Sequence, residues 1–246
     1  MKRQPVRLLI RWAAITTSLS ALLFLAAGST HIASIRRYLV VYSVLLLVTM
    51  LAVDPRLAQE RVHPANENSD PQRFAAGFFF LLTLTVDAFA VGRLHFGLNV
   101  PMLLRNAALI AFALSGSLQT WAMIVNPFFS PVVRLQTERG HHVIADGPYR
   151  FVRHPGYLAM LISVPASALA IGSWIALIPV ACFALTVFYR ARTEDEFLRK
   201  HLAGYADYAN RVTGVFISHP RKAILDNGCP VGGSEVLRIP DRNIEG

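Results

Sequence analysis

The fold is decided by two adjoining apolar runs, at residues 157–172 and 174–189. They read YLAMLISVPASALAIG and WIALIPVACFALTVFY, and Ser173 lies between them. A membrane-spanning helix needs about 20 mainly apolar residues, and lipid does not tolerate an open loop with unpaired backbone groups. The two runs are therefore predicted to form one tight hairpin of membrane helices, in which neighbouring helices accommodate Pro165 and Pro179.

The rest of the chain is apolar in the same way. Of its 246 residues 54% are hydrophobic and 16% are charged, which is too apolar for an ordinary water-soluble domain. Four further apolar runs lie at residues 12–28, 38–53, 74–92 and 103–125. A cleaved secretory signal is an alternative for the N-terminus, but Arg7 and Arg11 lie among its apolar residues and more runs follow. We therefore expect an all-α, polytopic membrane protein of about six transmembrane helices.

The basic residues predict the orientation of these helices. If the N-terminus is cytoplasmic, 20 of the 24 Lys and Arg residues lie on the cytoplasmic side, and the other four are Arg36, Arg37, Arg93 and Arg105. This split follows the positive-inside rule, and it predicts a multi-pass protein of the inner or plasma membrane with both termini in the cytoplasm. The net charge of +9 is then explained by topology and by attraction to anionic lipids, without a nucleic-acid partner.

Several kinds of chemistry find no support in the sequence. Cys182 and Cys229 are the two cysteines, too few for a disulfide framework or a four-cysteine zinc site. The chain has no G-x-S-x-G, G-x-G-x-x-G or P-loop motif. Asp87 is the one acid well inside an apolar run, and we expect it to pair with Arg93 or to face another helix rather than to act as a functional carboxylate.

Polar residues with possible chemistry gather on both sides of the hairpin. Residues 126–156 contain three histidines, His141, His142 and His154, but no H-E-x-x-H helix, so we predict no metal site. After the hairpin, Arg190 and Glu194 are four residues apart and share a helix face, as do Arg192 and Glu196. These charges are either interfacial anchors or a site at the cytoplasmic end of the hairpin. An apolar stripe follows, formed by Leu198, Leu202, Tyr205, Tyr208 and Val212.

Three motifs here occur in a specific order. They are GPY at residues 147–149, RHPGY at 153–157 and R-x-x-x-E-D-x-x-L at 190–198, followed by Tyr205 and Tyr208. In this order and spacing they resemble the isoprenylcysteine carboxyl methyltransferase family, which are membrane enzymes that use S-adenosylmethionine as cofactor. The resemblance covers about residues 126–216. One position departs from the family pattern, because the second acid of the pair is Asp195 and not glutamate.

The resemblance implies roles for individual residues. The cofactor-binding residues that it implies are Gln136, His141, His142, Val143, Ile144, Tyr149, His154, Pro155, Gly156, Tyr157 and Glu194. Glu194 would hold the ammonium group of the cofactor, and tyrosine faces would attract its sulfonium. Arg190 would bind an acceptor carboxylate, so that Arg190 and Glu194 form the expected catalytic pair. A slip of two residues would give these roles to Arg192 and Glu196.

The expected reaction is methyl transfer to a lipophilic acceptor, such as a prenylated or other lipid substrate, in contact with membrane lipids. A carboxylate acceptor needs no general base, whereas an amine or thiol would need one, with Asp195 or Glu196 nearest. Alternatives are a phospholipid amine or small-thiol methyltransferase, and a membrane reductase that uses NADPH. We expect N-terminal membrane helices at 1–125, a methyltransferase core at 126–216 and a polar tail at 217–246.

Overall fold

The computed structural model describes residues 4–57, 72–94 and 100–216, and these residues form helices and connecting loops without a β-strand. The α-helices are α1 (Gln4–Ala27), α2 (Ala33–Ala52), α4 (Gln72–Phe89), α5 (Met102–Val125), α6 (Pro155–Ile171), α7 (Leu177–His201) and α8 (Tyr205–Arg211). One π-helical segment and two short 3-10 helices join them, at Ala90–Leu94, Thr137–Arg139 and Gly147–Arg150. The prediction of an all-α fold is confirmed.

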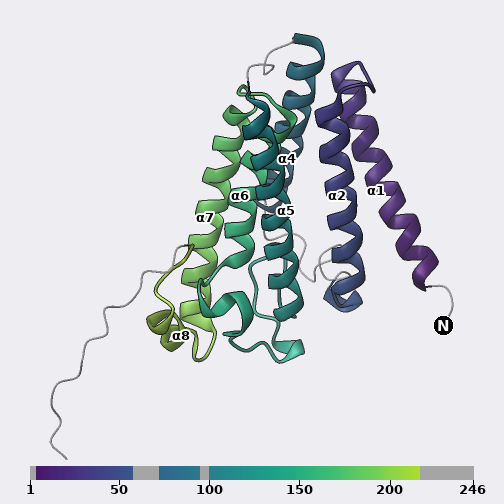
Figure 1. Ribbon diagram of the computed structural model, residues 1–246. Coiled ribbons are helices and arrows are strands. Elements are labelled where there is room, and N and C mark those ends of the chain that lie inside the picture. The colour runs from purple at the N-terminus through teal and green to yellow at the C-terminus, as the bar shows by residue number, and fades with distance from the viewer. Residues whose placement is uncertain (1–3, 58–71, 95–99, 217–246) are drawn as a thin grey trace, which may run out of the picture.

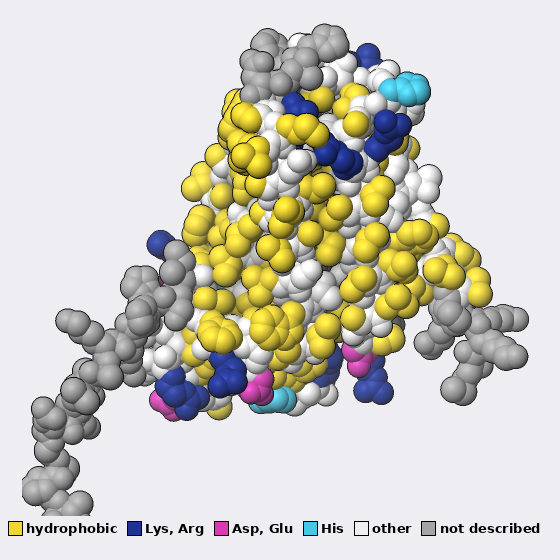
Figure 2. Space-filling model, in the orientation of Figure 1, with side chains coloured by type: hydrophobic (Ala, Val, Ile, Leu, Met, Phe, Trp, Pro, Cys, Tyr) yellow, Lys and Arg dark blue, Asp and Glu magenta, His cyan; other side chains and the backbone are white. Residues whose placement is uncertain are grey.

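The long helices run alternately up and down in one bundle, and α1 begins at the end of the bundle where α8 lies (Figure 1). Each of the six predicted runs falls on one of them. By length and composition, α1, α2, α4 with the π-helical segment, and α5 could each cross a membrane. The helix α6 is apolar but shorter, and α7 ends in charged residues. Hydrophobic side chains cover the middle of the bundle and charged ones gather at its two ends (Figure 2).

The hairpin of α6 and α7 forms as predicted, and its ends are set by local chemistry. Pro155 occupies the first turn of α6, where its missing N–H costs nothing. Gly172 follows the helix with a φ of +121°, which a residue with a side chain rarely adopts. The helix α6 buries small residues, among them Ala159, Ala166 and Ala168, and small side chains let membrane helices approach closely.

The charged segment after the hairpin continues α7 before the helix breaks. The helix α7 runs to His201, and Gly204, with a φ of +79°, separates it from α8. The predicted apolar stripe nevertheless gathers in one cluster, in which Tyr205, Tyr208 and Ala209 of α8 pack against partly buried neighbours. The helix α8 thus forms a small layer across the lower end of the hairpin (Figure 1).

One apolar cluster joins the N-terminal helices to the hairpin. It contains Leu23 of α1, Ile35 of α2, Leu84 of α4, Phe112 of α5 and Ile171 of α6. The two parts of the chain therefore share a core. The division of the chain at residues 125 and 216 stays a prediction, and the tail at 217–246 lies outside the described residues.

The four basic residues predicted on the non-cytoplasmic side lie at the upper end of the bundle. Arg37 donates a hydrogen bond to Asn106 at 3.0 Å, and the guanidinium of Arg105 lies beside Gly172 in the turn of the hairpin. Arg93 donates to the carbonyls of Ala26 and Leu25 at the end of α1, at 3.0 and 3.2 Å. The suggested pairing of Arg93 with Asp87 is therefore wrong, since Arg93 caps α1.

Asp87 is fully buried on α4. Its carboxylate oxygens make no hydrogen bond with any described residue. The alternative expectation, that Asp87 faces another helix, agrees with this position.

Candidate active site

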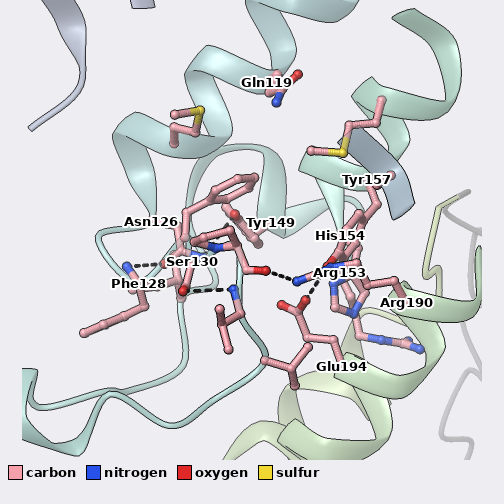
Figure 3. Close-up of a pocket in the computed structure, with 18 of the residues that line it drawn as sticks. Gln119, Asn126, Phe128, Ser130, Tyr149, Arg153, His154, Tyr157, Arg190 and Glu194 are labelled. Carbon is pink, nitrogen blue, oxygen red and sulfur yellow. Dashed lines mark hydrogen bonds between the residues drawn. The ribbon is translucent and has the colours of Figure 1, made fainter. Parts of the chain in front are cut away.

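A cavity of about 650 Å³ opens at the lower end of the bundle, between the hairpin and the N-terminal helices. Its polar part is formed by the loop after α5 and by the facing ends of α6 and α7 (Figure 3). Its apolar part reaches between the membrane helices and is lined by residues that include Leu45, Leu46, Phe80, Phe112 and Met123. The cavity therefore suits a ligand, or a pair of ligands, with one polar and one lipophilic end.

The loop after α5 is held in shape by two amides. At the end of α5, Asn126 accepts a hydrogen bond from the backbone N–H of Phe128 at 2.8 Å and donates one to the Tyr149 hydroxyl at 3.1 Å. Gln136 is fully buried, donates to the Phe128 carbonyl at 2.8 Å and accepts from Arg139 at 2.6 Å. These bonds occupy the Gln136 amide, which does not line the cavity. Gln136 thus shapes the loop.

The segment that follows Gly140 borders the cavity with His141, His142, Val143 and Ile144. Burial, with smaller contributions from His142 and nearby arginines, lowers the pKa of His141, which favours a neutral ring. The His141 ring lies against Phe128, with 4.4 Å between the ring centroids. Within the described residues, the backbone N–H groups of residues 142–144 donate no hydrogen bond. They can therefore serve a polar ligand.

The side chains of α6 and α7 that face the cavity are linked by hydrogen bonds. The Tyr157 hydroxyl donates to Glu194 Oε2 at 2.6 Å and accepts from Arg190 Nε at 2.8 Å. A second guanidinium nitrogen of Arg190 donates to the Pro131 carbonyl of the loop. Tyr157 therefore sits between the predicted catalytic pair and aligns Arg190 with Glu194 along the cavity wall (Figure 3).

Asp195, the next residue, points away from this wall into a buried network. It accepts two hydrogen bonds from Arg153, at 2.7 and 3.1 Å, one from Arg199 at 3.0 Å and one from the Tyr205 hydroxyl at 2.8 Å. His154 Nε2 lies 3.3 Å from the same carboxylate. Burial alone raises the pKa of Asp195, but the hydrogen bonds from His154, Arg153, Arg199 and Tyr205 outweigh it, so the pKa lies well below its usual value. Asp195 is therefore a charged anchor.

Arg153 extends this network to the C-terminal end of the described chain. Its guanidinium donates to the carbonyls of Val212 and Thr213, at 2.7 and 2.8 Å. Its backbone N–H donates to the Gly214 carbonyl at 3.0 Å. Because His154 follows directly, this anchoring fixes the entry to α6 and the position of the His154 ring on the cavity wall.

Most of the residues implied by the resemblance meet at this cavity. Those that line it are His141, His142, Val143, Ile144, Tyr149, His154, Tyr157, Arg190 and Glu194. Gln136, Pro155 and Gly156 do not line it: Gln136 is held by the loop, and Pro155 and Gly156 are buried in the first turn of α6. A Cβ at Gly156 would collide with the Phe129 ring, so this glycine lets the loop and α6 meet.

The alternative pair lies elsewhere. Arg192 and Glu196 are both exposed and neither lines the cavity. Asp195, which was a possible base, has its oxygens occupied by four donors. The described residues contain no group of three or more His, Cys, Asp or Glu side chains that could hold a metal ion.

Several lining residues were missed because no motif marks them. Asn126 and Phe128 precede the recognised motifs, and Tyr42, Phe80 and Gln119 come from membrane helices. Gln119 is an amide within an apolar run, a signal that could have been noticed. The apolar residues give no such signal, because their spacing is that of any membrane helix.

These features define an integral membrane protein whose helices enclose a cavity that is polar at one end and apolar at the other. Residues 98–200 match the model of the Isoprenylcysteine carboxyl methyltransferase (ICMT) family. The match spans 103 of the 246 residues, so this part of the chain is similar to that family, as the order of the motifs predicted. The matched region begins before α5, earlier than the predicted resemblance, and ends just before the end of α7. No match was found among curated proteins.

Proposed function

We propose that the protein transfers a methyl group from S-adenosylmethionine to the carboxylate of a lipophilic acceptor. The observation that carries this proposal is the cavity itself. In its wall, Arg190, Tyr157 and Glu194 are linked by hydrogen bonds where the polar part meets the apolar part. A polar cofactor and a lipophilic acceptor can approach such a point from opposite ends.

The polar part has the chemistry that S-adenosylmethionine requires. Glu194 offers a carboxylate to the ammonium group of the cofactor, and the free backbone N–H groups of residues 142–144 suit its polar groups. Tyr149, Tyr157 and His154 present ring faces, which attract onium cations. When bound, the cofactor supplies an activated methyl group on a sulfonium. The chain supplies the charge, the donors and the enclosure.

Arg190 is the proposed anchor of the acceptor carboxylate. Its guanidinium is buried and is held by the Tyr157 hydroxyl and the Pro131 carbonyl, so its direction is fixed before an acceptor binds. A planar guanidinium binds a carboxylate with two parallel hydrogen bonds. Holding two reactants in alignment can itself supply much of the rate enhancement.

The arrangement of acids favours a carboxylate acceptor. A carboxylate is already ionised at neutral pH, and no proton has to be removed. An amine or thiol acceptor would need a base, but Asp195 is saturated with hydrogen bonds and Glu196 is exposed away from the cavity. Glu194, which we assign to the cofactor, would be the one acid left at the cavity wall among the described residues.

The product distinguishes these acceptors. The purified full chain is incubated with S-adenosylmethionine labelled in the methyl group and with a membrane lipid extract. We expect lipid-soluble label that mild base releases as methanol, as from a methyl ester. Base-stable label on a phospholipid amine would contradict the carboxylate assignment, and absence of transfer would contradict the proposed function. Glu196→Gln serves as the matched control, because it changes an exposed acid on the same helix.

The orientation of the site in the membrane is also part of this proposal. The charge distribution favours a cytoplasmic position for the lower end of the bundle, with α8 and the cavity mouth. Single cysteines at Thr30 and at Thr137, at opposite ends of the bundle, test it by labelling with an impermeant reagent in intact cells. Labelling at Thr30 alone supports a cytoplasmic site, and labelling at Thr137 alone would contradict it.

A further inference from the structure

Gln119 is a polar side chain in the apolar part of the cavity. It lies on α5, seven residues before Asn126, and the two share the cavity-facing stripe with Phe112, Gly116 and Met123. A helix rises 1.5 Å per residue, so the backbones of Gln119 and Asn126 are about 10 Å apart along α5. Figure 3 shows Gln119 set apart from the polar groups around Asn126, His154 and Glu194.

Most other polar groups in this part of the cavity are already satisfied. The hydroxyls of Thr49 and Thr120 lie 2.7 Å apart, and each is within hydrogen-bond distance of a carbonyl of its own helix, at 2.8 and 3.0 Å. The Ser163 hydroxyl donates to the Met160 carbonyl of its own helix at 3.3 Å. The Gln119 amide makes no hydrogen bond with any described residue, although it borders the cavity. Gln119 is half-buried, so its amide is open to a polar group that enters the cavity.

We propose that Gln119 determines acceptor specificity by binding a second polar group, a hydroxyl or carbonyl, on the lipophilic part of the acceptor. This inference rests on the proposed function and adds to it a substrate class, namely long lipophilic carboxylates with a hydrogen-bonding group part of the way along the chain. The amide of Gln119 both donates and accepts, so either group suits it.

An unsubstituted hydrocarbon chain is disfavoured by the same residue. It would cover the Gln119 amide and remove water from it without offering a hydrogen bond in return, and a buried polar group left unpaired weakens binding. The apolar residues around Gln119 would contact both kinds of chain equally. We therefore assign the discrimination to Gln119.

Two fatty acids that differ by one hydroxyl test the inference. Stearic acid and 12-hydroxystearic acid compete with radiolabelled stearic acid for the full chain in lipid nanodiscs. We expect 12-hydroxystearic acid to bind about 2- to 10-fold more tightly, the effect of one net hydrogen bond. The variants Gln119→Leu and Gln119→Met should remove this preference and still bind stearic acid. The control Ser117→Leu, at an exposed position on the same helix, should keep it.

The outcomes separate this inference from the proposed function. Equal affinity of the two acids for the wild type, a preference that survives in both Gln119 variants, or no binding of either acid would overturn the role of Gln119. Transfer of labelled methyl from S-adenosylmethionine is measured on the same samples. A preference without methyl transfer would retain the role of Gln119 and contradict the proposed function. Methyl transfer without a preference would retain the proposed function and overturn the role of Gln119.

Discussion

Two of the arginine–acid pairs on α7 have the same spacing of four residues but face different surroundings. Arg190 and Glu194 face the cavity, where Tyr157 lies between them. Asp195 and Arg199 face α8 and the entry to α6, where Arg153 and Tyr205 complete the network. The Glu194 carboxylate lines the cavity and accepts a hydrogen bond from Tyr157, whereas the Asp195 carboxylate accepts bonds from Arg153, Arg199 and Tyr205. Adjacent acids can therefore divide ligand binding from anchoring.

Removal of the anchoring acid should have the largest effect. In Asp195→Ala the buried Arg153 guanidinium loses its counter-charge, and breaking a buried ion pair in this way costs about 3–5 kcal/mol. We expect a clear fall in the thermal unfolding midpoint of the purified protein. The exposed Glu196→Ala is the control. An unchanged midpoint in Asp195→Ala would show that the network does not anchor the hairpin.

The low pKa of Asp195 gives the stability a defined pH dependence. A carboxyl group whose pKa is lowered by folding stabilises the fold above its unfolded pKa, about 3.9, and this contribution is lost as the pH falls towards the folded pKa. We expect the unfolding midpoint to fall below about pH 4. The variant Asp195→Asn, already less stable at neutral pH, should show a smaller fall in its unfolding midpoint. If its midpoint falls as steeply as that of the wild type, the acid sensitivity belongs to other groups.

On the cavity face, Arg190→Lys should affect turnover more than stability. Lysine keeps the charge but not the two-pronged geometry for a carboxylate, and the loss of a charged hydrogen bond costs about 1.5–3 kcal/mol, or about 10- to 100-fold in turnover. Affinity for S-adenosylmethionine should stay near that of the wild type. Arg192→Lys, at an exposed position, is the matched control. Full turnover in Arg190→Lys would indicate that Arg190 is only an interfacial anchor.

The smallest effect is expected at Tyr208, in the layer that supports both faces. Its hydroxyl donates to the Tyr149 carbonyl at 2.8 Å, and one such bond contributes about 1 kcal/mol. Tyr208→Phe should lower the unfolding midpoint slightly, by less than Asp195→Ala. A loss as large as that of Asp195→Ala would show that α8, and not the acid, holds the network together.

The two halves of the cavity differ in how far the sequence predicted them. The ordered motifs placed His154, Tyr157, Arg190 and Glu194 correctly at one point, because a short-turn hairpin must bring its two ends together. The sequence suggested Asp195 as a possible base and did not show that it points away from the cavity. Side chains one residue apart on a helix point about 100° apart, and the tilt of α7 decides which of them faces the loop. Gln136 was assigned to the cofactor, but its amide holds the loop.

The apolar half could not be predicted from the sequence. Leu45, Phe80 and Phe112 occur at spacings that any membrane helix shows, and lipid-facing and cavity-facing residues are equally apolar. Only their tertiary arrangement makes them part of the cavity wall. The break at Gly204 was missed for a similar reason, because the apolar stripe continues across it in helical spacing while the backbone there has a φ of +79°.

The central claim is that the cavity face of α7 binds the cofactor and the other faces do not. It is tested most directly by the dissociation constant of S-adenosylmethionine, measured calorimetrically on the purified wild type, Glu194→Gln and Glu196→Gln. We predict that Glu194→Gln weakens binding by about 1–3 kcal/mol, the cost of a lost charge-assisted bond, and that Glu196→Gln binds like the wild type. Unchanged binding in a folded Glu194→Gln protein, or a loss confined to Glu196→Gln, would contradict the claim.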